Sequence, residues 1–373
     1  MIVIADLHIG KVADSFMVDG VPSQTRDILR RLSAVLVRAK MLKTSIVVAG
    51  DVFNRVNPTS QSISVFFSWL RDCVAAKVPV YIIAGNHDAG VDWSSATMLA
   101  NASLPNVSVI TTPSEVHVVD DHVSRPVLFF PHVPTAVQES AEQGHGSVSA
   151  WASSKAPKAE FVITHGMIDS SEYSNDIFFE AGNAMRIDPA AFPKLKLMCL
   201  GHIHTCMSGD KWTYPGSLTI NNFGEVDERK GWIEVDLSDL SYTWYEYPDD
   251  CTPWVHVELD LTDKDETSLS EDAVRELVEG AIVKITVLAK SHGVVNETYI
   301  RQLFGKYGYV SRFETRVDAT SLVRVPDENR VSHFDLLVDY ISDMDVGDAD
   351  KKLAQSIGRE IIAKVMGEGV FRD

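Results

Sequence analysis

The sequence is poor in cysteine, and the few cysteines it has are scattered. The four cysteines are Cys73, Cys199, Cys206 and Cys251. They include no CxxC pair and are not regularly spaced. This pattern argues against a disulfide framework and against a zinc site built from thiolates. We therefore expect reduced thiols, as in the cytoplasm, and a fold that needs no covalent cross-links.

Long hydrophobic runs are also absent. Met1 leads directly into a strand-like run, without the basic segment and apolar core of a secretory signal. No apolar stretch approaches the roughly 20 residues of a membrane-spanning helix. The sequence predicts a protein that is neither secreted nor embedded in a membrane.

Basic residues are in deficit. Lysine and arginine total 34 against 52 aspartates and glutamates, which gives a formal net charge of −18. A protein that coats nucleic acid nonspecifically carries the opposite balance. Any polyanionic substrate must therefore be held by a local feature.

What the chain does have is apolar material for more than one core. Its 373 residues are 45% hydrophobic, and this length predicts two or three domains. The composition changes between Pro248 and Pro253, and becomes irregular after Val317. We predict a large α/β domain over 1–250, a smaller α/β domain over 251–320, and a linker with a helical tail over 321–373.

Hydrophobic periodicity places the first domain in the α/β class. Apolar residues at helical spacing predict helices over Thr25–Leu42, Ser60–Ala76 and Ser94–Ala102. The stretch Gln138–Pro157 is rich in Gly, Ser and Ala, which predicts either a helix with frayed ends or a loop that passes around the functional site. Three short runs with turn signals predict a second sheet of antiparallel strands: Lys211–Tyr214, Gly231–Val235 and Tyr242–Tyr247.

Five apolar runs stop at aspartate, asparagine or histidine. The clearest is VYIIAGNHD, which ends in Asn86, His87 and Asp88. The other four runs lead to Asp6 with His8, to Asp51, to His165, and to His202 with His204. Ligands of α/β sheets bind beyond the carboxyl ends of strands. Neighbouring strands that point the same way would therefore bring these side chains together.

Carboxylate, amide and imidazole groups in one cluster predict a site for two divalent cations. Asp51 is the natural bridge because it follows a central strand. We assign Asp6, His8, Asp51 and His204 to one ion, and Asp51, Asn86, His165 and His202 to the other. A lone histidine after a strand is more often structural, but five such ends in one chain are not explained by chance.

His87 is left without a metal in this assignment. Beside the ions it suits stabilisation of a transferring phosphoryl group or protonation of the leaving oxygen. Asp88 would then orient its ring. The remaining histidines are expected to be structural or on the surface: His117, His122, His132, His145, His256, His292 and His333.

The order DxH, GD, GNHD, H and GHxH resembles the signature of the calcineurin-like metallophosphoesterases. Within that family the chain resembles the SbcD-type nuclease subunits of double-strand-break repair and recombination, bacterial or phage. The matching motifs are ADLHIG, GDVFNRVNPTS, AGNHD, GHIHT, YPGSL and KGWIEVDL. The likeness covers Met1 to about Tyr247 and implies a four-layer αββα sandwich with a dinuclear metal site. The segments that follow resemble that group's capping domain and ATPase-binding tail, with weaker motifs.

The resemblance also implies a function. It indicates metal-dependent hydrolysis of DNA phosphodiesters, as an exonuclease, an endonuclease or both, in DNA repair, recombination or replication. The usual ion is Mn²⁺, with Mg²⁺ as the alternative, and the partner is an SbcC-type coiled-coil ATPase. The implied location is the cytoplasm of a bacterial cell or of a phage-infected host.

The chain departs from its relatives just after the bridging aspartate. Asn54 stands where some relatives carry a histidine that helps to place DNA for exonuclease action, so the balance of the two activities stays open. Asn54 and Arg55 are candidate substrate-binding residues. The stretch DVFNR also lacks the Asp-Arg-Gly whose arginine grips phosphate in Ser/Thr phosphatases.

Two other functions remain open. One is a phosphoesterase for a small phosphodiester or phosphomonoester, which would need neither the added domain nor the helical tail. The other is a non-catalytic scaffold for an ATPase. The scaffold has the least support because all the proposed ligands are present.

The helix predicted over Ser60–Ala76 carries more apolar residues than one crossover face requires. Together with Ser94–Ala102 it predicts a twofold interface in a homodimer, as the resemblance also implies. The alternative is that its largest apolar side chains lie in the core of one copy: Phe66, Phe67, Trp69 and Leu70.

Two amphipathic helices are predicted in the tail, over His333–Met344 and Asp348–Met366. Each carries one apolar stripe and is too short to be stable alone in water. The two helices can pair as a hairpin. We expect them instead to dock on the coiled-coil root of the ATPase, which would also supply a DNA-binding surface.

Overall fold

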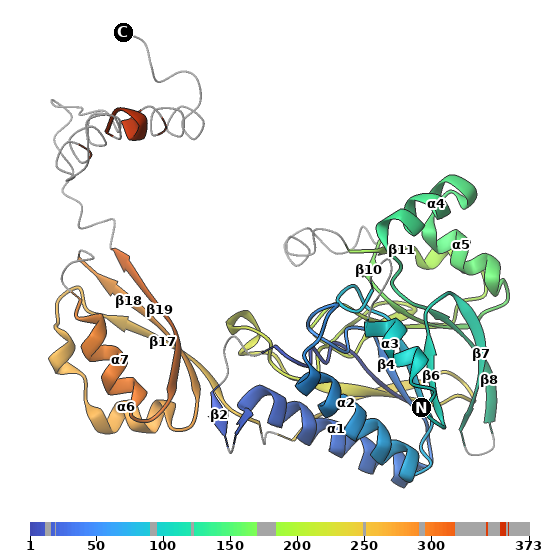
Figure 1. Ribbon diagram of the computed structural model, residues 1–373, viewed down its shortest axis with the longest axis horizontal. Helices are drawn as coiled ribbons and strands as arrows, with labels where there is room; N and C mark the ends of the chain where they lie inside the picture. Colours follow the sequence, from blue (N-terminus) through green and yellow to red (C-terminus); the bar gives the residue numbers. More distant parts are fainter. Residues whose placement is uncertain are drawn as a thin grey trace. The chain divides into compact units, whose positions relative to one another are not determined.

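The computed structural model describes residues 1–11, 16–18, 20–89, 95–120, 123–169, 184–248, 251–290, 295–317, 341, 351–355 and 357. The chain divides into two compact units, Met1–Arg316 and Val317–Asp373. The first unit is a mixed α/β structure with two six-stranded sheets, a three-stranded sheet and two short two-stranded sheets. Figure 1 shows how its helices and strands are arranged. In the second unit, the described residues 341, 351–355 and 357 are helical.

The first sheet contains the N-terminal strand in its interior. Its order is β16 (Tyr242–Glu246), β15 (Gly231–Val235), β1 (Ile2–Ile4), β4 (Ile46–Ala49), β5 (Val80–Ile83) and β6 (Val107–Ile110). The strands β1, β4, β5 and β6 run parallel, and β15 and β16 add an antiparallel edge. The carboxyl ends of β1, β4 and β5 therefore lie at one edge.

The second sheet has the same number of strands. Its order is β13 (Met207–Ser208), β14 (Trp212–Tyr214), β12 (Leu197–Gly201), β9 (Phe161–His165), β8 (Val123–Phe130) and β7 (Ser114–Asp120). The strands β14, β12, β9 and β8 run parallel, and β13 and β7 are antiparallel edges. The carboxyl ends of β9 and β12 are thus neighbours as well.

The two sheets share one hydrophobic cluster. It contains Val3 and Val47 from the first sheet and Phe129, Ile163 and Cys199 from the second. On β1 the alternate residues Ile2 and Ile4 belong to a different cluster, as the two-residue period of a strand requires. Each face of β1 is therefore buried.

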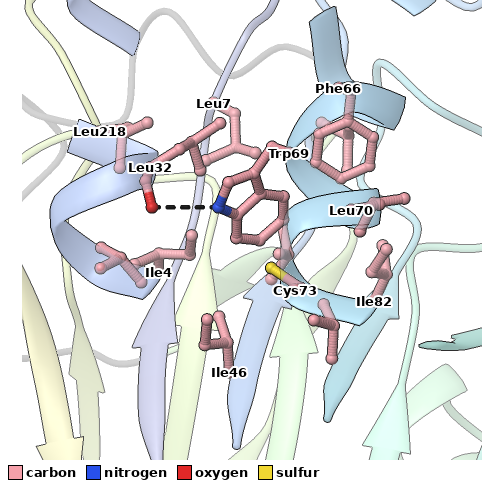
Figure 2. Packing of buried hydrophobic residues seen from close by; sticks show 14 of the residues in the cluster. Ile4, Leu7, Leu32, Ile46, Phe66, Trp69, Leu70, Cys73, Ile82 and Leu218 are labelled. Atoms are coloured by element: carbon pink, nitrogen blue, oxygen red, sulfur yellow. Dashed lines mark hydrogen bonds between the residues drawn. The ribbon is translucent and has the colours of Figure 1, made fainter. Parts of the chain in front are cut away.

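Helices cover the other face of each sheet. The helices α1 (Ser23–Leu42), α2 (Ser60–Ala75) and α3 (Ser95–Asn101) pack on the first sheet, and α4 (Thr135–His145) and α5 (Val148–Lys155) pack on the second. On α1, residues at helical spacing are buried: Ile28, Leu32, Val35 and Ala39. Figure 2 shows Trp69 of α2 donating from Nε1 to the Leu32 carbonyl at 3.0 Å, which joins the two helices.

A smaller body follows, with a hydrophobic cluster of its own. It contains β17 (Trp254–Asp260), α6 (Glu271–Val278), β18 (Ile282–Ala289), α7 (Glu297–Gly305) and β19 (Tyr309–Val317). Short elements complete the first unit: β2 (Met17–Val18), β3 (Val21–Pro22), β10 (Met167–Ile168), β11 (Arg186–Ile187) and the 3₁₀ helices η1 (Pro189–Ala191), η2 (Phe223–Glu225) and η3 (Glu266–Ser268).

The predicted second sheet of antiparallel strands is wrong. The runs after His204 do not form a sheet of their own, because β14 extends the second large sheet while β15 and β16 extend the first. Short strands with turn signals do not reveal which partner they will pair with. The stretch Gln138–Pro157 likewise forms parts of two helices, α4 and α5, separated at Gly146.

The side chains proposed for a twofold interface lie mostly inside one copy. Phe66, Trp69 and Leu70 are buried in the cluster between α2 and the first sheet, and Phe67 packs against it. Because the first sheet needs this cover, the apolar excess of α2 is no argument for a dimer. The predicted tail helices lie mainly outside the described residues. None of the described helices combines the length and hydropathy of a transmembrane span.

Candidate metal centre

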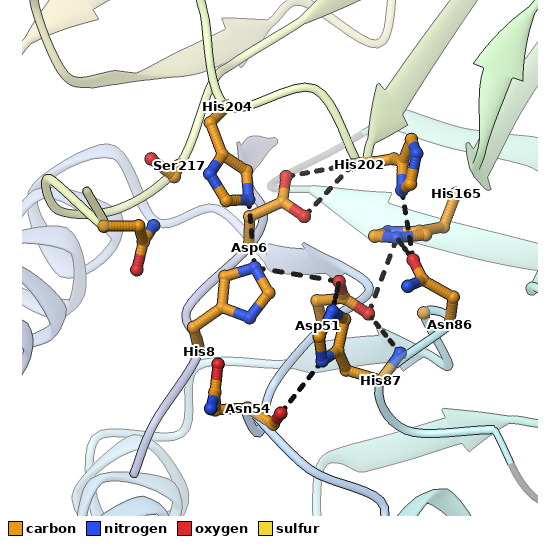
Figure 3. A network of polar contacts seen from close by, with 12 residues as sticks. Asp6, His8, Asp51, Asn54, Asn86, His87, His165, His202, His204 and Ser217 are labelled. Carbon is orange, nitrogen blue, oxygen red and sulfur yellow. Dashed lines mark hydrogen bonds and ion pairs between the residues drawn. The ribbon is translucent and has the colours of Figure 1, made fainter. Parts of the chain in front are cut away.

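Five strand ends from the two large sheets meet in one polar cluster (Figure 3). Strands β1, β4 and β5 supply the residues of the DxH, GD and GNHD motifs, while β9 and β12 supply His165 and the GHxH motif. The sequence predicts neighbouring strands that point the same way, which holds within each sheet. The convergence itself also crosses between sheets: His165 Nδ1 donates to the Ala49 carbonyl of β4 at 2.8 Å.

Asp51 lies at the centre of the cluster, and its two carboxylate oxygens serve different sides. Oδ2 lies 3.7 Å from His8 Nε2 and 4.0 Å from His87 Nε2. Oδ1 lies 3.5 Å from His165 Nε2 and accepts a hydrogen bond from the His87 backbone N–H at 2.9 Å. The side chain is only 3% exposed. Asp51 therefore lies between the two groups of residues that the sequence analysis assigns to separate ions.

One group of ligands lies on the Oδ2 side. The Nε2 atoms of His8 and His204 are 3.0 Å apart, and a carboxylate oxygen of Asp6 lies within 4.8 Å of both rings' ligand atoms. Asp6 is held in place by the backbone N–H of His202, which donates to both carboxylate oxygens at 3.0 and 3.1 Å. The structure thus brings together the four residues that the sequence analysis assigns to one ion.

The other group lies on the Oδ1 side. The side-chain oxygen of Asn86 is 3.0 Å from both His165 Nε2 and His202 Nδ1. Figure 3 shows the Asn86 oxygen joined by dashed lines to the His165 and His202 rings, and His165 joined in turn to Asp51. The residues assigned to the second ion are therefore also in one place.

The protonation states fit cation binding. Burial lowers the pKa of His8 and of His202 to about 3, so both rings are neutral near pH 7 and offer a lone pair. Burial alone would raise the pKa of Asp51, but the nearby His165 and His8 hold it below its usual range. Burial would lower the pKa of His165, yet Asp51 and Asp6 raise it to about 9. The neutral rings of His8 and His202 and the Asp51 carboxylate are donors suited to divalent cations, whereas His165 is protonated near pH 7 and must lose its proton to bind one.

The backbone is strained where these side chains are presented. Positive φ angles occur at four of these residues: 53° at Asp6, 45° at His8, 52° at Asp51 and 105° at His202. Residues other than glycine rarely adopt positive φ. His202 directly follows β12, Asp6 and Asp51 come one residue later after β1 and β4, and His8 lies further along the loop after β1. Such strain persists only where the surrounding structure enforces it, and it concentrates at functional sites.

Two glycines allow the strand ends to come this close. A Cβ atom at Gly50, where φ is +89°, would lie 2.2 Å from His165 Nδ1. A Cβ atom at Gly85 would lie 2.0 Å from Asp51 Oδ1. Any side chain at these two positions would collide with His165 or Asp51. The GD and GNHD motifs therefore need glycine there.

His87 reaches the edge of the cluster from the loop after β5. Its side chain is 41% exposed, which makes it far more accessible than Asp51. Its Nδ1 donates to the backbone carbonyl of Asn54 at 2.9 Å, which leaves Nε2 directed towards Asp51. With His8 and Asp51 it also forms a group close enough to share a cation.

Asp88 does not orient His87 in the way the sequence analysis expects. The buried carboxylate of Asp88 instead accepts hydrogen bonds from the backbone N–H groups of Val52, Phe53 and Gly85, at 3.0 to 3.1 Å. It ties the loop after β4 to the loop after β5, and so acts on the shape of the site. The His87 ring is oriented instead by the backbone carbonyl of Asn54, and a backbone contact of this kind cannot be predicted from a pattern of side chains.

The candidate substrate-binding residues lie at the rim. Asn54 is half-buried, and its backbone N–H donates to the Ile9 carbonyl at 3.1 Å, which fixes the loop. Arg55 is exposed. The Asn54 carbonyl contacts His87, and Arg55 is the next residue in the chain; neither belongs to the two groups of candidate ligands.

Sequence reasoning misses one residue that contacts the cluster. Glu225, in η2, accepts a hydrogen bond from His204 Nδ1 at 2.8 Å. Burial would raise the pKa of Glu225, but the hydrogen bond from His204 and the charge of Lys230 lower it to about 2. The sequence signal is weak, because Glu225 does not follow an apolar run as the other residues of the cluster do.

His132 is a second residue that the sequence analysis places elsewhere. It follows β8, the strand beside β9, and its backbone N–H donates to the Ala84 carbonyl of the GNHD loop at 2.9 Å. Burial first, and then the charge of His165, lower its pKa to about 4. The run VLFFPH resembles the other strand ends, but Pro131 separates the histidine from its strand.

This chain belongs to the calcineurin-like phosphoesterase family, whose pattern it matches over residues 1–206. The family comprises hydrolases that depend on a pair of metal ions, so the cluster around Asp51 is the candidate dinuclear centre. The match includes all seven proposed ligands and ends before Glu225. The particular substrate is not defined by this membership.

One similar solved structure is described as "Structural and Functional Characterization of a Novel Archaeal Phosphodiesterase". The sequence identity is 11% and the TM-score is 0.31, over 66% of this chain and 98% of that chain. A likeness this distant adds nothing to the family assignment, which rests on the sequence match.

Proposed function

We propose that this protein is a metal-dependent DNA nuclease that hydrolyses phosphodiester bonds together with an SbcC-type ATPase. The observation that carries the hydrolytic part is the Asp51 carboxylate between two groups of ligands in a chain of the phosphoesterase family. The DNA part is supported by the motifs around the ligands, GDVFNRVNPTS, YPGSL and KGWIEVDL, which resemble those of SbcD-type nucleases.

The residues present would hold two cations as the sequence analysis assigns them. Asp6, His8, Asp51 and His204 would bind one, and Asp51, Asn86, His165 and His202 the other. We propose Mn²⁺, with Mg²⁺ as the alternative, because carboxylate and amide oxygens accompany the imidazoles. When bound, the pair would polarise a phosphoryl oxygen and lower the pKa of a water molecule.

The remaining chemistry falls to His87. The Asn54 carbonyl holds its Nδ1 proton, so the ring presents Nε2 to the open side of the cluster. In its protonated form, His87 would donate from Nε2 to a phosphoryl oxygen or to the oxygen that leaves phosphorus. We propose that Asn54, whose carbonyl contacts His87, and Arg55, which follows it in the chain, contact the adjoining nucleotide.

The proposed fold details follow the same resemblance. Two large sheets that share a buried cluster, with helices on their other faces, support a four-layer αββα sandwich. The body formed by β17, β18, β19, α6 and α7 has a separate core, which supports a capping domain over 251–320. We propose that this domain guides DNA to the site.

A second candidate function is hydrolysis of a small phosphodiester or phosphomonoester. The observation in its favour is that every proposed ligand lies before residue 205, so the segment 251–317 contributes none of them. The net charge of −18 also offers no general surface for DNA.

One assay separates the two candidates. Linear duplex DNA, circular single-stranded DNA and bis(p-nitrophenyl) phosphate are incubated with the purified chain, with Mn²⁺ and with chelator. Cleavage of either DNA with Mn²⁺ alone supports the nuclease. Rapid turnover of the small diester, with both DNAs intact even when the ATPase is added, would favour the second candidate.

We also propose two partners. The tail would bind the ATPase, and two copies of the chain would form a homodimer, for which the resemblance is now the only support. Light scattering at micromolar concentration tests the dimer: a mass of two chains is expected, and a strict monomer would exclude it.

A further inference from the structure

The ring of His204 is held from behind by a segment that carries none of the proposed ligands. Glu225 Oε1 lies 2.8 Å from His204 Nδ1, on the side of the ring opposite to Nε2. The Nε2 atom meanwhile lies 3.0 Å from His8 Nε2, inside the cluster. A ring has only two nitrogens, so the acceptor on Nδ1 decides what Nε2 can offer.

Glu225 is itself fixed in a single orientation. Its Oε2 accepts hydrogen bonds from the Asn221 backbone N–H at 3.0 Å and from Lys230 Nζ at 2.8 Å. Its Oε1 also accepts from Asn222 Nδ2 at 2.7 Å. A carboxylate with both oxygens engaged cannot turn away from His204 without losing several charge-assisted hydrogen bonds.

Lys230 links the same segment to the backbone of His204. Its side chain is 2% exposed, and Nζ donates to Glu225, to the Glu228 carboxylate at 2.9 Å and to the His204 carbonyl at 3.1 Å. All three ammonium protons therefore have acceptors. Lys230 fixes the peptide of His204, while Glu225 fixes its ring.

We propose that Glu225 is a positioning residue that holds the proton of His204 on Nδ1 and leaves the Nε2 lone pair for one cation. A metal-binding histidine commonly donates its other N–H to a carboxylate, which fixes the ring and strengthens the ligand. The inference rests on the metal pair proposed above but not on DNA being the substrate. The motif YPGSL precedes the segment 221–230 and the motif KG begins at its last residue, Lys230. The proposal therefore gives these two motifs a structural role beside the metal centre.

The simpler reading is that Glu225 and Lys230 form a buried ion pair that only stabilises the loop. Both readings predict some loss of stability when Glu225 is changed. They differ in metal binding, because only a positioning role weakens one ion selectively. Metal binding measured without any substrate therefore decides between them.

The test uses the full chain, stripped of metal, titrated with Mn²⁺ by calorimetry and followed by electron paramagnetic resonance. Glu225→Ala is expected to weaken one of the two ions by about 10- to 100-fold and to leave the other unchanged. At two equivalents of Mn²⁺ the spectrum should change from that of a spin-coupled pair towards that of isolated ions.

Glu228→Ala is the matched control. Glu228 contacts Lys230 and accepts from Thr205 Oγ1 at 2.5 Å, so it belongs to the same segment without contacting the His204 ring. Its loss should leave both affinities unchanged. An equal loss of one ion in Glu228→Ala would assign the effect to the loop as a whole and overturn the proposal.

Glu225→Gln serves if the alanine variant does not fold. Glutamine can offer His204 Nδ1 at most a neutral amide oxygen, which is a weaker acceptor than the carboxylate, whichever way its single oxygen turns. One ion should then bind several-fold more weakly. Unchanged binding of both ions in the folded Gln variant would overturn the proposal.

A double-mutant cycle with His204→Ala completes the test. In that background the change at Glu225 should no longer alter metal affinity, because its target is gone. An undiminished effect there would also overturn the proposal. Since no DNA is present, failure of this inference is separate from failure of the nuclease assignment.

Discussion

His8 and His204 approach each other with their Nε2 atoms 3.0 Å apart in a largely buried cluster. Two neutral rings that both presented lone pairs at this distance would repel each other. His8 is neutral near pH 7, because burial lowers its pKa to about 3. Burial would lower the pKa of His204, but the hydrogen bond to Glu225 and the charge of Asp6 raise it. Either a proton from His204 or a cation must therefore fill the space between the two rings.

Metal binding is consequently expected to compete with protons. The pKa of His165 is raised to about 9 by Asp51 and Asp6 against the effect of burial, so without metal this ring is protonated below that pH. A cation needs the deprotonated ring. Affinity should fall as the pH is lowered through 9, by about tenfold per pH unit for one displaced proton.

Calorimetry in buffers of different ionisation enthalpy measures this proton release. We expect roughly one proton or more to be released per pair of ions near pH 7.5, and fewer near pH 10. Binding enthalpies that do not depend on the buffer near pH 7.5 would contradict the assignment of His165 as a ligand.

The Asp51 carboxylate gives the second prediction. Asp51→Asn keeps the side-chain shape but removes the charge shared by the two groups. Both ions should be lost at micromolar metal, and hydrolysis with them. Elemental analysis after gel filtration provides the measurement. Asn54→Ala is the control, because Asn54 acts on His87 through its backbone and should retain two ions. Two ions bound to folded Asp51→Asn would exclude a bridging role.

A third prediction concerns His87, whose distance to Asp51 leaves two roles open. His87→Ala should keep both ions and lose about 10² to 10⁴ in the rate of phosphodiester cleavage, as expected when a positioned proton donor is removed. Metal content and single-turnover rates are measured on the same sample. Loss of one ion would show that His87 is a ligand, as its proximity to His8 and Asp51 would permit.

The strand ends were predictable because burial and chemistry leave separate marks in the sequence. A strand such as VYII must be apolar throughout, so Asn86 and His87 stand out directly after it. The same reasoning yields Asp51 after β4 and His165 at the end of β9. Their meeting across two sheets was not readable from the residues alone, because strand patterns do not specify which strands pair.

The supporting contacts were less predictable for a different reason. Glu225 ends the short 3₁₀ helix η2, and a glutamate among other charged residues carries no recognisable pattern. The orientation of His87 depends on the Asn54 backbone carbonyl, a group that every residue possesses. The predicted contact between Asp88 and His87 rests only on their being adjacent in the sequence. In the structure the Asp88 carboxylate accepts hydrogen bonds from the backbone of Val52 and Phe53.

The last prediction concerns the tail. Among the described residues of the second unit, Leu353 and Ile357 are helical, four residues apart, and 61% and 49% exposed. Residues at this spacing lie on one face of a helix. Large apolar side chains exposed together are typical of a surface that a partner covers, and helix-in-groove recognition uses such anchors.

Deletion of Ser332–Asp373 should therefore abolish co-purification with the SbcC-type ATPase while sparing Mn²⁺-dependent cleavage of short single strands. The cleavage should survive because every proposed ligand lies in the first unit. A double substitution, Leu353→Glu with Ile357→Glu, should weaken binding by at least 10-fold, because it places two charges on the proposed apolar contact. Lys351→Glu with Lys352→Glu is the matched control, since it also adds two acidic residues to the helix but leaves both apolar side chains in place. A truncated chain that binds the ATPase with unchanged affinity would refute a docking role for the tail.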